Sequence, residues 1–167
     1  TYPDLRTQIM TSGMLRVGTT GDYAPFSYSG DDMSFTGIDI DLALNLAESL
    51  NVELIFIKTS WPTLMNDLAA GLFDIAMSGV SIIPARQQHA YFSAPYHVGG
   101  KSPITLCSRV DEFSSIEEID QPSVRAIVNP GGTNERFIDA KLRRAKKILH
   151  QDNRTIFNEI INGNADL

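Results

Sequence analysis

The feature that most constrains the fold of this chain is an alternation of short apolar runs with segments of helical periodicity. In the first half, the runs at 15–20, 52–57 and 73–82 have the length and apolar character of strands. Two segments between them, 38–51 and 60–74, have the spacing of amphipathic helices. Strands that alternate with helices in this way form mainly parallel sheets with helices on both faces. The sequence therefore predicts an α/β protein.

Local signals predict the inner faces and the ends of those two helices. Leu42, Leu46 and Leu50 recur every four residues, so they are predicted to form the stripe of the first helix that faces the core. In the second helix, Ser60 is predicted to cap the N-terminus, and Gly71 lies where the helix is expected to end.

The second half continues the alternation with shorter elements. Helices are predicted at 115–119, 133–143 and 153–164, and strands at 102–108, 124–129 and 147–150. Cys107 is expected in the first of these strands, and we find no internal repeat in the sequence. Gly99 and Gly100 interrupt the pattern, so we expect a first lobe at 1–101 and a second at 102–167. Because the last residues resemble the start of a buried strand, we expect the chain to stop within the second lobe.

Composition excludes several classes of function. The chain of 167 residues has a net charge of −6 and a pI of about 4.9, which argues against a nucleic-acid surface. The basic cluster at 141–147 is better explained as a solvated helix face. No apolar run approaches the ~20 residues needed for membrane insertion, and the first residues lack the layout of a signal peptide. The histidines and the single cysteine are scattered, so we expect no metal, no cofactor and no disulfide framework.

Polar residues gather where predicted strands end, which is where open α/β sheets bind their ligands. The loop after the first strand contains Asp22, Tyr23 and Phe26. Its aromatic side chains fit either a loop packed over a core or the wall of a ligand pocket, and the sequence leaves both interpretations open.

A second such loop, at 78–87, leads from a strand into a predicted helix. Ser78, Gly79 and Ser81 belong to a Ser/Gly turn, and Arg86 lies about one turn into the helix. A guanidinium group can hold a carboxylate through two parallel hydrogen bonds. The alternative is a solvent-exposed surface arginine, but the neighbouring turn favours a carboxylate site.

The segment 129–135 joins a strand to a helix through Gly131 and Gly132. Glycines allow close approach to a ligand, and the N–H groups of Thr133 and Asn134 would begin a helix whose positive end attracts anions. The Gly-Lys-Ser/Thr ending of a phosphate-binding loop is absent, which favours a carboxylate. A tight strand-to-helix connection without any ligand explains the same residues equally well.

The order and spacing of several segments resemble those of the periplasmic solute-binding proteins of the amino-acid type. These segments are 15–28, 37–50, 73–96 and 129–137, and the resemblance covers almost the whole chain. It implies a two-lobe, type II periplasmic-binding-protein-like fold, with mainly parallel sheets flanked by helices, that closes around a small ligand. In that family the Ser/Gly turn and its arginine hold the carboxylate of the ligand, which assigns this task to Ser78, Ser81 and Arg86.

Further segments, above all 59–62 and 129–135, resemble the branch of this family that dehydrates prephenate and arogenate. This resemblance implies a carbon–oxygen lyase of phenylalanine biosynthesis, which forms phenylpyruvate or phenylalanine with loss of water and CO2. Asn129 would contact the leaving hydroxyl group, and Lys101 would assist the second carboxylate site. The remaining residues implied in the pocket are Asp22, Trp61, Gly132, Thr133 and Asn134. For Trp61, a packing role at the start of a helix explains the residue equally well.

The general acid of that branch is a glutamate expected beyond residue 167, so no acid is assigned in this chain. The alternative function is that of a periplasmic amino-acid-binding protein, whose partner would be an ABC transporter in the membrane. Under both interpretations the ligand is a small dicarboxylate or an amino acid, and the implied location is the periplasm. The sequence is compatible with a homo-oligomer and does not specify the oligomeric state.

Overall fold

The structure is a computed structural model that describes residues 4–32 and 34–167. The chain divides into two compact units, Thr1–Ser93 and Ala94–Leu167, and each is described by itself. Within the described ranges, no helix is long and apolar enough to span a bilayer.

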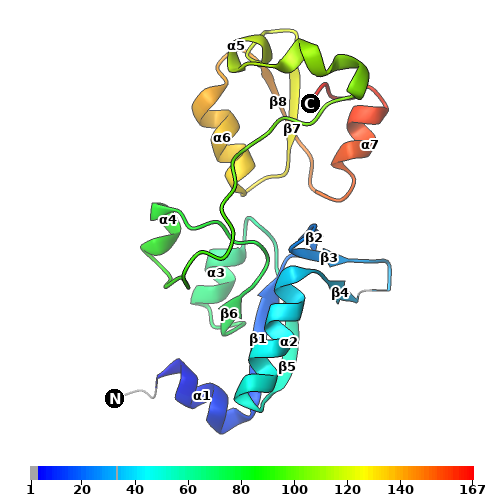
Figure 1. Cartoon of the computed structure of the whole chain (residues 1–167). Helices are drawn as coiled ribbons and strands as arrows, with labels where there is room; N and C mark the ends of the chain where they lie inside the picture. The colour runs from blue at the N-terminus through cyan, green and yellow to red at the C-terminus, as the bar shows by residue number, and fades with distance from the viewer. Residues whose placement is uncertain (1–3, 33) are drawn as a thin grey trace. The chain divides into compact units, whose positions relative to one another are not determined.

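The first unit is built on a parallel sheet in the order β5-β1-β6 (Figure 1). Its strands are β1 (Met14–Thr19), β5 (Glu53–Lys58) and β6 (Ile75–Ala76). Its helices are α1 (Leu5–Ser12), α2 (Ile38–Leu50), α3 (Leu64–Ala69) and α4 (Pro84–Gln87). Three short antiparallel strands, β2 (Asp22–Tyr23), β3 (Ser27–Ser29) and β4 (Phe35–Thr36), form a second sheet after β1. The predicted alternation of strands and helices is thus confirmed here.

The face of α2 that packs on the sheet differs from the predicted leucine stripe. Ala43 and Ala47 are buried against β1, whereas Leu46 and Leu50 are only partly buried and Leu42 is 39% exposed. Small side chains on the contact line let a helix approach a sheet closely, and the longer leucines then flank that line. The prediction was therefore wrong for Leu42.

The start of α3 also differs from its prediction, while its end agrees. The helix begins at Leu64 with Thr63 as N-cap, and Ser60 instead contributes its carbonyl to the Leu64 N–H and its hydroxyl to Thr63 at 2.8 Å. Pro62 lies within this preceding turn. Gly71 follows the helix with a φ of 70°, a left-handed conformation that glycine adopts without strain.

The second unit contains a parallel pair of strands, β7 (Arg125–Val128) and β8 (Lys146–Leu149). Its α-helices are α5 (Ile116–Ile119), α6 (Thr133–Lys141) and α7 (Ile156–Ile161). Val124, Ala126 and Val128 form its core together with Ile138 and Leu142.

The strand predicted at 102–108 is absent from this unit. Residues 101–106 form no sheet pairing in the described structure, and Cys107 begins a 3₁₀ helix, Cys107–Phe113. Cys107 is exposed, and Phe113 fills the core instead. An apolar run becomes a strand only where a neighbouring strand accepts its backbone hydrogen bonds, and composition alone does not show that neighbour.

The last residues do not form the strand that the sequence had suggested, but they form backbone hydrogen bonds with β7. Asp166 donates its N–H to the Arg125 carbonyl at 2.9 Å, and Leu167 accepts the Ile127 N–H at 2.8 Å. Ala165 is buried between Ile127 and Ile160. These hydrogen bonds hold the last residues beside β7.

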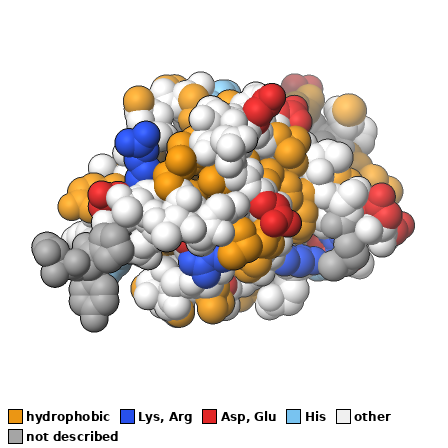
Figure 2. Space-filling model, turned by 90° about the horizontal axis from the view of Figure 1, so that it is seen from below, with side chains coloured by type: hydrophobic (Ala, Val, Ile, Leu, Met, Phe, Trp, Pro, Cys, Tyr) orange, Lys and Arg blue, Asp and Glu red, His pale blue; other side chains and the backbone are white. Residues whose placement is uncertain are grey.

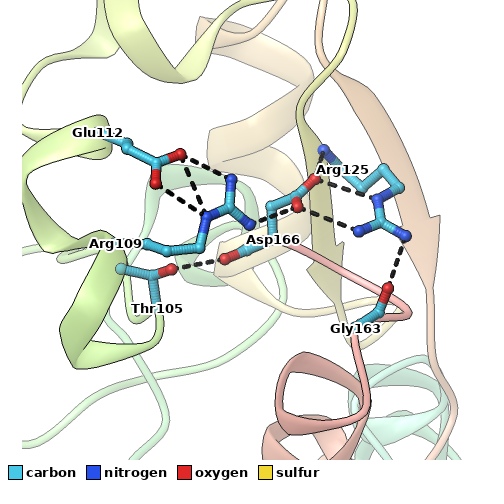
Figure 3. A network of polar contacts seen from close by, with 6 residues as sticks. All are labelled: Thr105, Arg109, Glu112, Arg125, Gly163 and Asp166. Carbon is cyan, nitrogen blue, oxygen red and sulfur yellow. Dashed lines mark hydrogen bonds and ion pairs between the residues drawn. The ribbon is translucent and has the colours of Figure 1, made fainter.

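The two units share one anchoring arrangement, which corrects the statement that the sequence contains no repeat. In the first unit, Asp74 accepts the Arg16 backbone N–H at 2.8 Å and its guanidinium at 2.6 Å. Arg16 also donates to the Gly71 carbonyl at 2.8 Å. In the second unit, Arg125 makes the corresponding contacts to Asp166 at 2.8 and 3.1 Å (Figure 3).

Segments 63–75 and 155–167 align around these clamps. Both contain Thr, Asn, Gly and Asp at the same relative positions. The Gly163 carbonyl accepts a hydrogen bond from the Arg125 guanidinium at 2.8 Å, just as the Gly71 carbonyl accepts one from Arg16. Most other positions exchange one residue for another, so the repeat is obscured in the sequence. The shared hydrogen bonds make it recognisable.

Apolar side chains also reach the surface. Figure 2 shows hydrophobic side chains gathered near the middle of the face that it presents, between separate acidic and basic ones. The exposed large apolar residues of the first unit include Leu5, Met10, Leu44, Leu72 and Ile82. Tyr23, Phe26 and Trp61 do not belong to this set, because all three are half-buried. The aromatic residues of the predicted site are therefore held by their surroundings.

Candidate functional site

Trp61 and Asp22 form the centre of an aromatic cluster in the first unit. The Trp61 indole N–H donates to Asp22 Oδ1 at 2.9 Å. Tyr23 packs edge-on against Trp61 with ring centroids 5.8 Å apart, and Phe26 lies 5.3 Å from Tyr23. Residues 39 positions apart in the sequence are thus brought together, because β2 follows β1 and the Trp61 turn follows the adjacent β5. The three aromatic side chains form one continuous wall.

Gly79 lies directly against that wall. A Cβ atom at Gly79 would lie 2.8 Å from the Phe26 ring and 2.9 Å from Tyr23, and the residue has a left-handed φ of 64°. Only glycine therefore fits this position without rearrangement. Its N–H donates to the carboxylate of Asp39 at 2.6 Å.

The two serines of the turn are placed differently. Ser78 is fully buried, and its hydroxyl pairs with the Thr20 hydroxyl at 2.8 Å and accepts the Thr20 N–H at 3.1 Å. Ser81 is exposed, and its carbonyl accepts a hydrogen bond from Arg86 at 3.2 Å. Ser78 thus fastens the end of β6 to the end of β1, while Ser81 lies beside the guanidinium.

Arg86 is buried although it lies on the short helix α4, with 4% of its surface exposed. Its guanidinium carbon lies 5.9 Å from the centre of the Trp61 ring. A cation at this distance from an indole face is attracted by the ring. Arg86 is therefore part of the aromatic wall and is not the solvent-exposed surface residue that the sequence left as the alternative.

In the second unit, Lys101 joins the start of α6. Its ammonium group donates to Thr133 Oγ1 at 2.8 Å and to Asn134 Oδ1 at 2.5 Å. Thr133 is the first residue of the helix, and Gly132 is its N-cap. The group combines a positive charge, a hydroxyl and a helix start, all of which favour an anion.

The glycine turn before α6 is held by a side chain of the same helix. Gly131 has a φ of 77°, and its N–H donates to Glu135 Oε2 at 2.7 Å. The other carboxylate oxygen of Glu135 contacts Lys147 at 3.1 Å. The Gly131 hydrogen bond, followed by the one from Lys147, lowers the pKa of Glu135.

Asn129 precedes this turn at the end of β7 and is 4% exposed. Its side-chain nitrogen would lie 3.4 Å from a Cβ atom placed on Gly132. The Asn129 amide and the backbone of the glycine turn are thus in close proximity.

Two acidic residues, Asp39 and Glu135, were missed as parts of these groups. Asp39 accepts the N–H of Gly79 and Glu135 accepts the N–H of Gly131, and both glycines have a left-handed φ. The Glu135 contact had a sequence signal, because an acid in the first turn of a helix commonly reaches back to the N–H groups before it. The Asp39 contact joins residues 40 positions apart and had none.

These observations define a class of protein. Residues 15–165 match the bacterial extracellular solute-binding proteins, family 3, and the chain belongs to that family. The chain is 56% identical over 160 residues to cyclohexadienyl dehydratase of Pseudomonas aeruginosa, which covers 96% of this chain and 60% of the relative. It is 25% identical over 162 residues to the L-cystine-binding protein TcyJ of Escherichia coli, a match that covers 97% of this chain and 60% of that relative. The chain therefore spans about 60% of the length of these relatives.

Solved structures support the same family. The ancestral amino-acid-binding protein described as a precursor of cyclohexadienyl dehydratase is 38% identical with a TM-score of 0.92, over 96% of this chain and 71% of that one. An amino-acid ABC transporter substrate-binding protein of Streptococcus pneumoniae, bound to L-arginine, is 26% identical with a TM-score of 0.88, over 96% and 68%. The predicted type II periplasmic-binding fold is thus confirmed.

Proposed function

We propose that the protein catalyses the decarboxylating dehydration of prephenate to phenylpyruvate and of arogenate to phenylalanine. The observation that supports this most strongly is the 56% identity to cyclohexadienyl dehydratase, which far exceeds the 25% identity to the L-cystine-binding protein. The reaction would belong to phenylalanine biosynthesis, and its location would be the periplasm.

The substrate chemistry matches the two groups of residues. Prephenate carries two carboxylates and a ring hydroxyl; one carboxylate leaves as CO2, its bonding electrons enter the ring, and the hydroxyl leaves as water once it is protonated. We assign one carboxylate to Arg86, whose planar fork suits it, with Ser81 beside it. We assign the other to Lys101 and the start of α6 at Thr133 and Asn134.

Asn129 is assigned to the leaving hydroxyl. Its amide can donate a hydrogen bond to the oxygen as the C–O bond lengthens, and a fixed donor stabilises such developing charge. An amide does not supply the proton itself, so Asn129 is a partner of the general acid. Trp61, Tyr23 and Phe26 would cover the ring of the substrate, because flat apolar faces pack well against it.

A second candidate function is capture of an amino acid for an ABC transporter. It is favoured by the relatives named as amino-acid-binding proteins and by the arginine-bound structure. Both functions need a carboxylate site, and Arg86 serves either. The partner in this case would be a transporter in the membrane.

One experiment separates the two functions. The full-length gene product is incubated with prephenate, and phenylpyruvate formation is followed. We expect turnover that saturates with substrate. Calorimetric titration with the common L-amino acids is run in parallel, and tight amino-acid binding without any phenylpyruvate would eliminate the enzyme in favour of the transport function.

A further inference from the structure

Asp39 is a buried carboxylate that neither the sequence patterns nor the assigned site accounts for. It lies in the first turn of α2 and is only 1% exposed. Burial of a charged group costs free energy unless the group receives hydrogen bonds. A hydrophobic side chain would fill such a buried position without this desolvation cost, so we infer that the carboxylate itself has a role.

Its hydrogen bonds join two loops that are distant in sequence. The side chain accepts the Gly79 N–H at 2.6 Å, and the backbone N–H of Asp39 donates to the Phe26 carbonyl at 2.9 Å. One loop carries Asp22, Tyr23 and Phe26, and the other carries the turn that leads to Arg86. A single residue thus fixes two of the segments that carry the predicted ligand contacts of the first unit.

The close packing at Gly79 makes this attachment consequential. The Phe26 and Tyr23 rings leave no room for a side chain at Gly79, so a small shift of the turn would displace the aromatic wall. The same turn continues to Ser81, whose carbonyl holds Arg86 at 3.2 Å. The position of the guanidinium therefore depends on how firmly Gly79 is held.

We propose that Asp39 is the positioning residue of the first-unit carboxylate site, acting through Gly79 on Arg86 and the aromatic wall without touching the ligand. This rests on the carboxylate site of the proposed function, which both candidate functions share. A site whose groups are already fixed loses less entropy when the ligand binds. The loss of Asp39 should consequently weaken binding of the substrate and of the transition state by the same factor.

The test compares Asp39→Ala and Asp39→Asn with Asp41→Asn in the full-length protein. Asp41 is a matched control, because it is also acidic and in the first turn of α2 but is exposed. Prephenate turnover gives KM and kcat, and calorimetry gives the Kd for phenylpyruvate and for the L-amino acids. We expect Asp39→Ala to raise KM or Kd by about 10- to 100-fold with kcat within about twofold, because uniform binding is lost. Asp39→Asn should show a smaller rise and Asp41→Asn none.

A purely structural role would lower the melting temperature and leave KM and Kd unchanged in the folded variants, and that result would overturn the proposal. If Asp39→Ala does not fold, Asp39→Asn decides, with the NMR shift of the Gly79 amide as a direct readout of the lost charge. An altered Gly79 shift with wild-type affinity would also overturn it. If the wild type binds an amino acid but forms no phenylpyruvate, the proposed function fails, while the Kd values still test Asp39.

Discussion

Asp166 accepts hydrogen bonds from the backbone N–H and the guanidinium of Arg125, at 2.8 and 3.1 Å. Arg109 adds a further contact at 2.7 Å, and the Asp166 side chain is 7% exposed. The Arg125 guanidinium, followed by that of Arg109, holds the pKa of Asp166 far below its ordinary value, against the opposing effect of burial. This carboxylate is therefore a structural anchor of the second unit.

Asp166→Asn should lower the free energy of unfolding by about 2–3 kcal/mol at neutral pH, because the Arg125 guanidinium loses its carboxylate partner and Arg109 keeps only Glu112. Thermal or urea unfolding followed by circular dichroism measures this loss. Asp139→Asn is the control, because Asp139 pairs with Lys147 but is 56% exposed, and such a pair contributes less than about 1 kcal/mol. Equal losses in the two variants would contradict the anchoring role.

The same pair predicts a pH dependence. The folded pKa of Asp166 is lowered, so its contribution is complete well above the unfolded value of about 3.9 and declines as the pH falls below it. The stability of the wild type should therefore fall more steeply between about pH 5 and pH 2 than that of Asp166→Asn. Unfolding midpoints across this range should converge at the acidic end, and parallel curves would refute the linkage.

Arg86→Ala should raise the KM for prephenate by about 100-fold or more, because a buried charge-assisted grip on a carboxylate is lost. Arg86→Lys keeps the charge but not the planar fork, so we expect it to restore only part of the affinity. Steady-state kinetics measures both. A KM and kcat equal to those of the wild type would remove Arg86 from the site.

Asn129→Ala should lower kcat by about 10- to 100-fold with a KM within a few-fold of the wild type, because its contact strengthens only as the hydroxyl leaves. Circular dichroism confirms the fold of the variant, since Asn129 is buried. A rise in KM without a change in kcat would reassign Asn129 to substrate binding.

Glu135→Ala should accelerate hydrogen exchange at the Gly131 amide by about tenfold, because that N–H loses its 2.7 Å acceptor. Glu135→Gln keeps an acceptor of the same length and should protect the amide better. NMR exchange measurements distinguish the two, and equal rates would show that the turn does not depend on Glu135.

The sequence was informative where function and structure depend on local patterns. Helices α2, α6 and α7 lie within segments that were predicted to be helical, and Gly71 ends α3 because its left-handed φ suits glycine. The turns around Gly79 and Gly131 were predicted because glycine marks backbone that other residues cannot adopt.

Apart from the N-cap of α3, where Thr63 takes the place predicted for Ser60, the failures involve partners distant in the chain. Whether 102–108 forms a strand depends on a neighbouring strand, and whether Leu42 is buried depends on how α2 lies on the sheet. The bond from Gly79 to Asp39 spans 40 positions, so no local pattern could reveal it. Ser78 was expected to serve a ligand, yet its hydroxyl is engaged with Thr20, and its part in binding stays a prediction.

The arginine–aspartate arrangement that both units share, Arg16 with Asp74 and Arg125 with Asp166, has a consequence for the origin of the chain. Thr20 and Asn129 each lie four residues after the arginine of their clamp, at the end of equivalent strands. If both halves descend from one duplicated ancestor, these two residues were once the same position. In the first half this position is Thr20, whose hydroxyl pairs with the buried Ser78. In the second half it is Asn129, whose amide lies beside the glycine turn. The role proposed for Asn129 would then have arisen at a position where the other half of the chain uses Thr20 for packing.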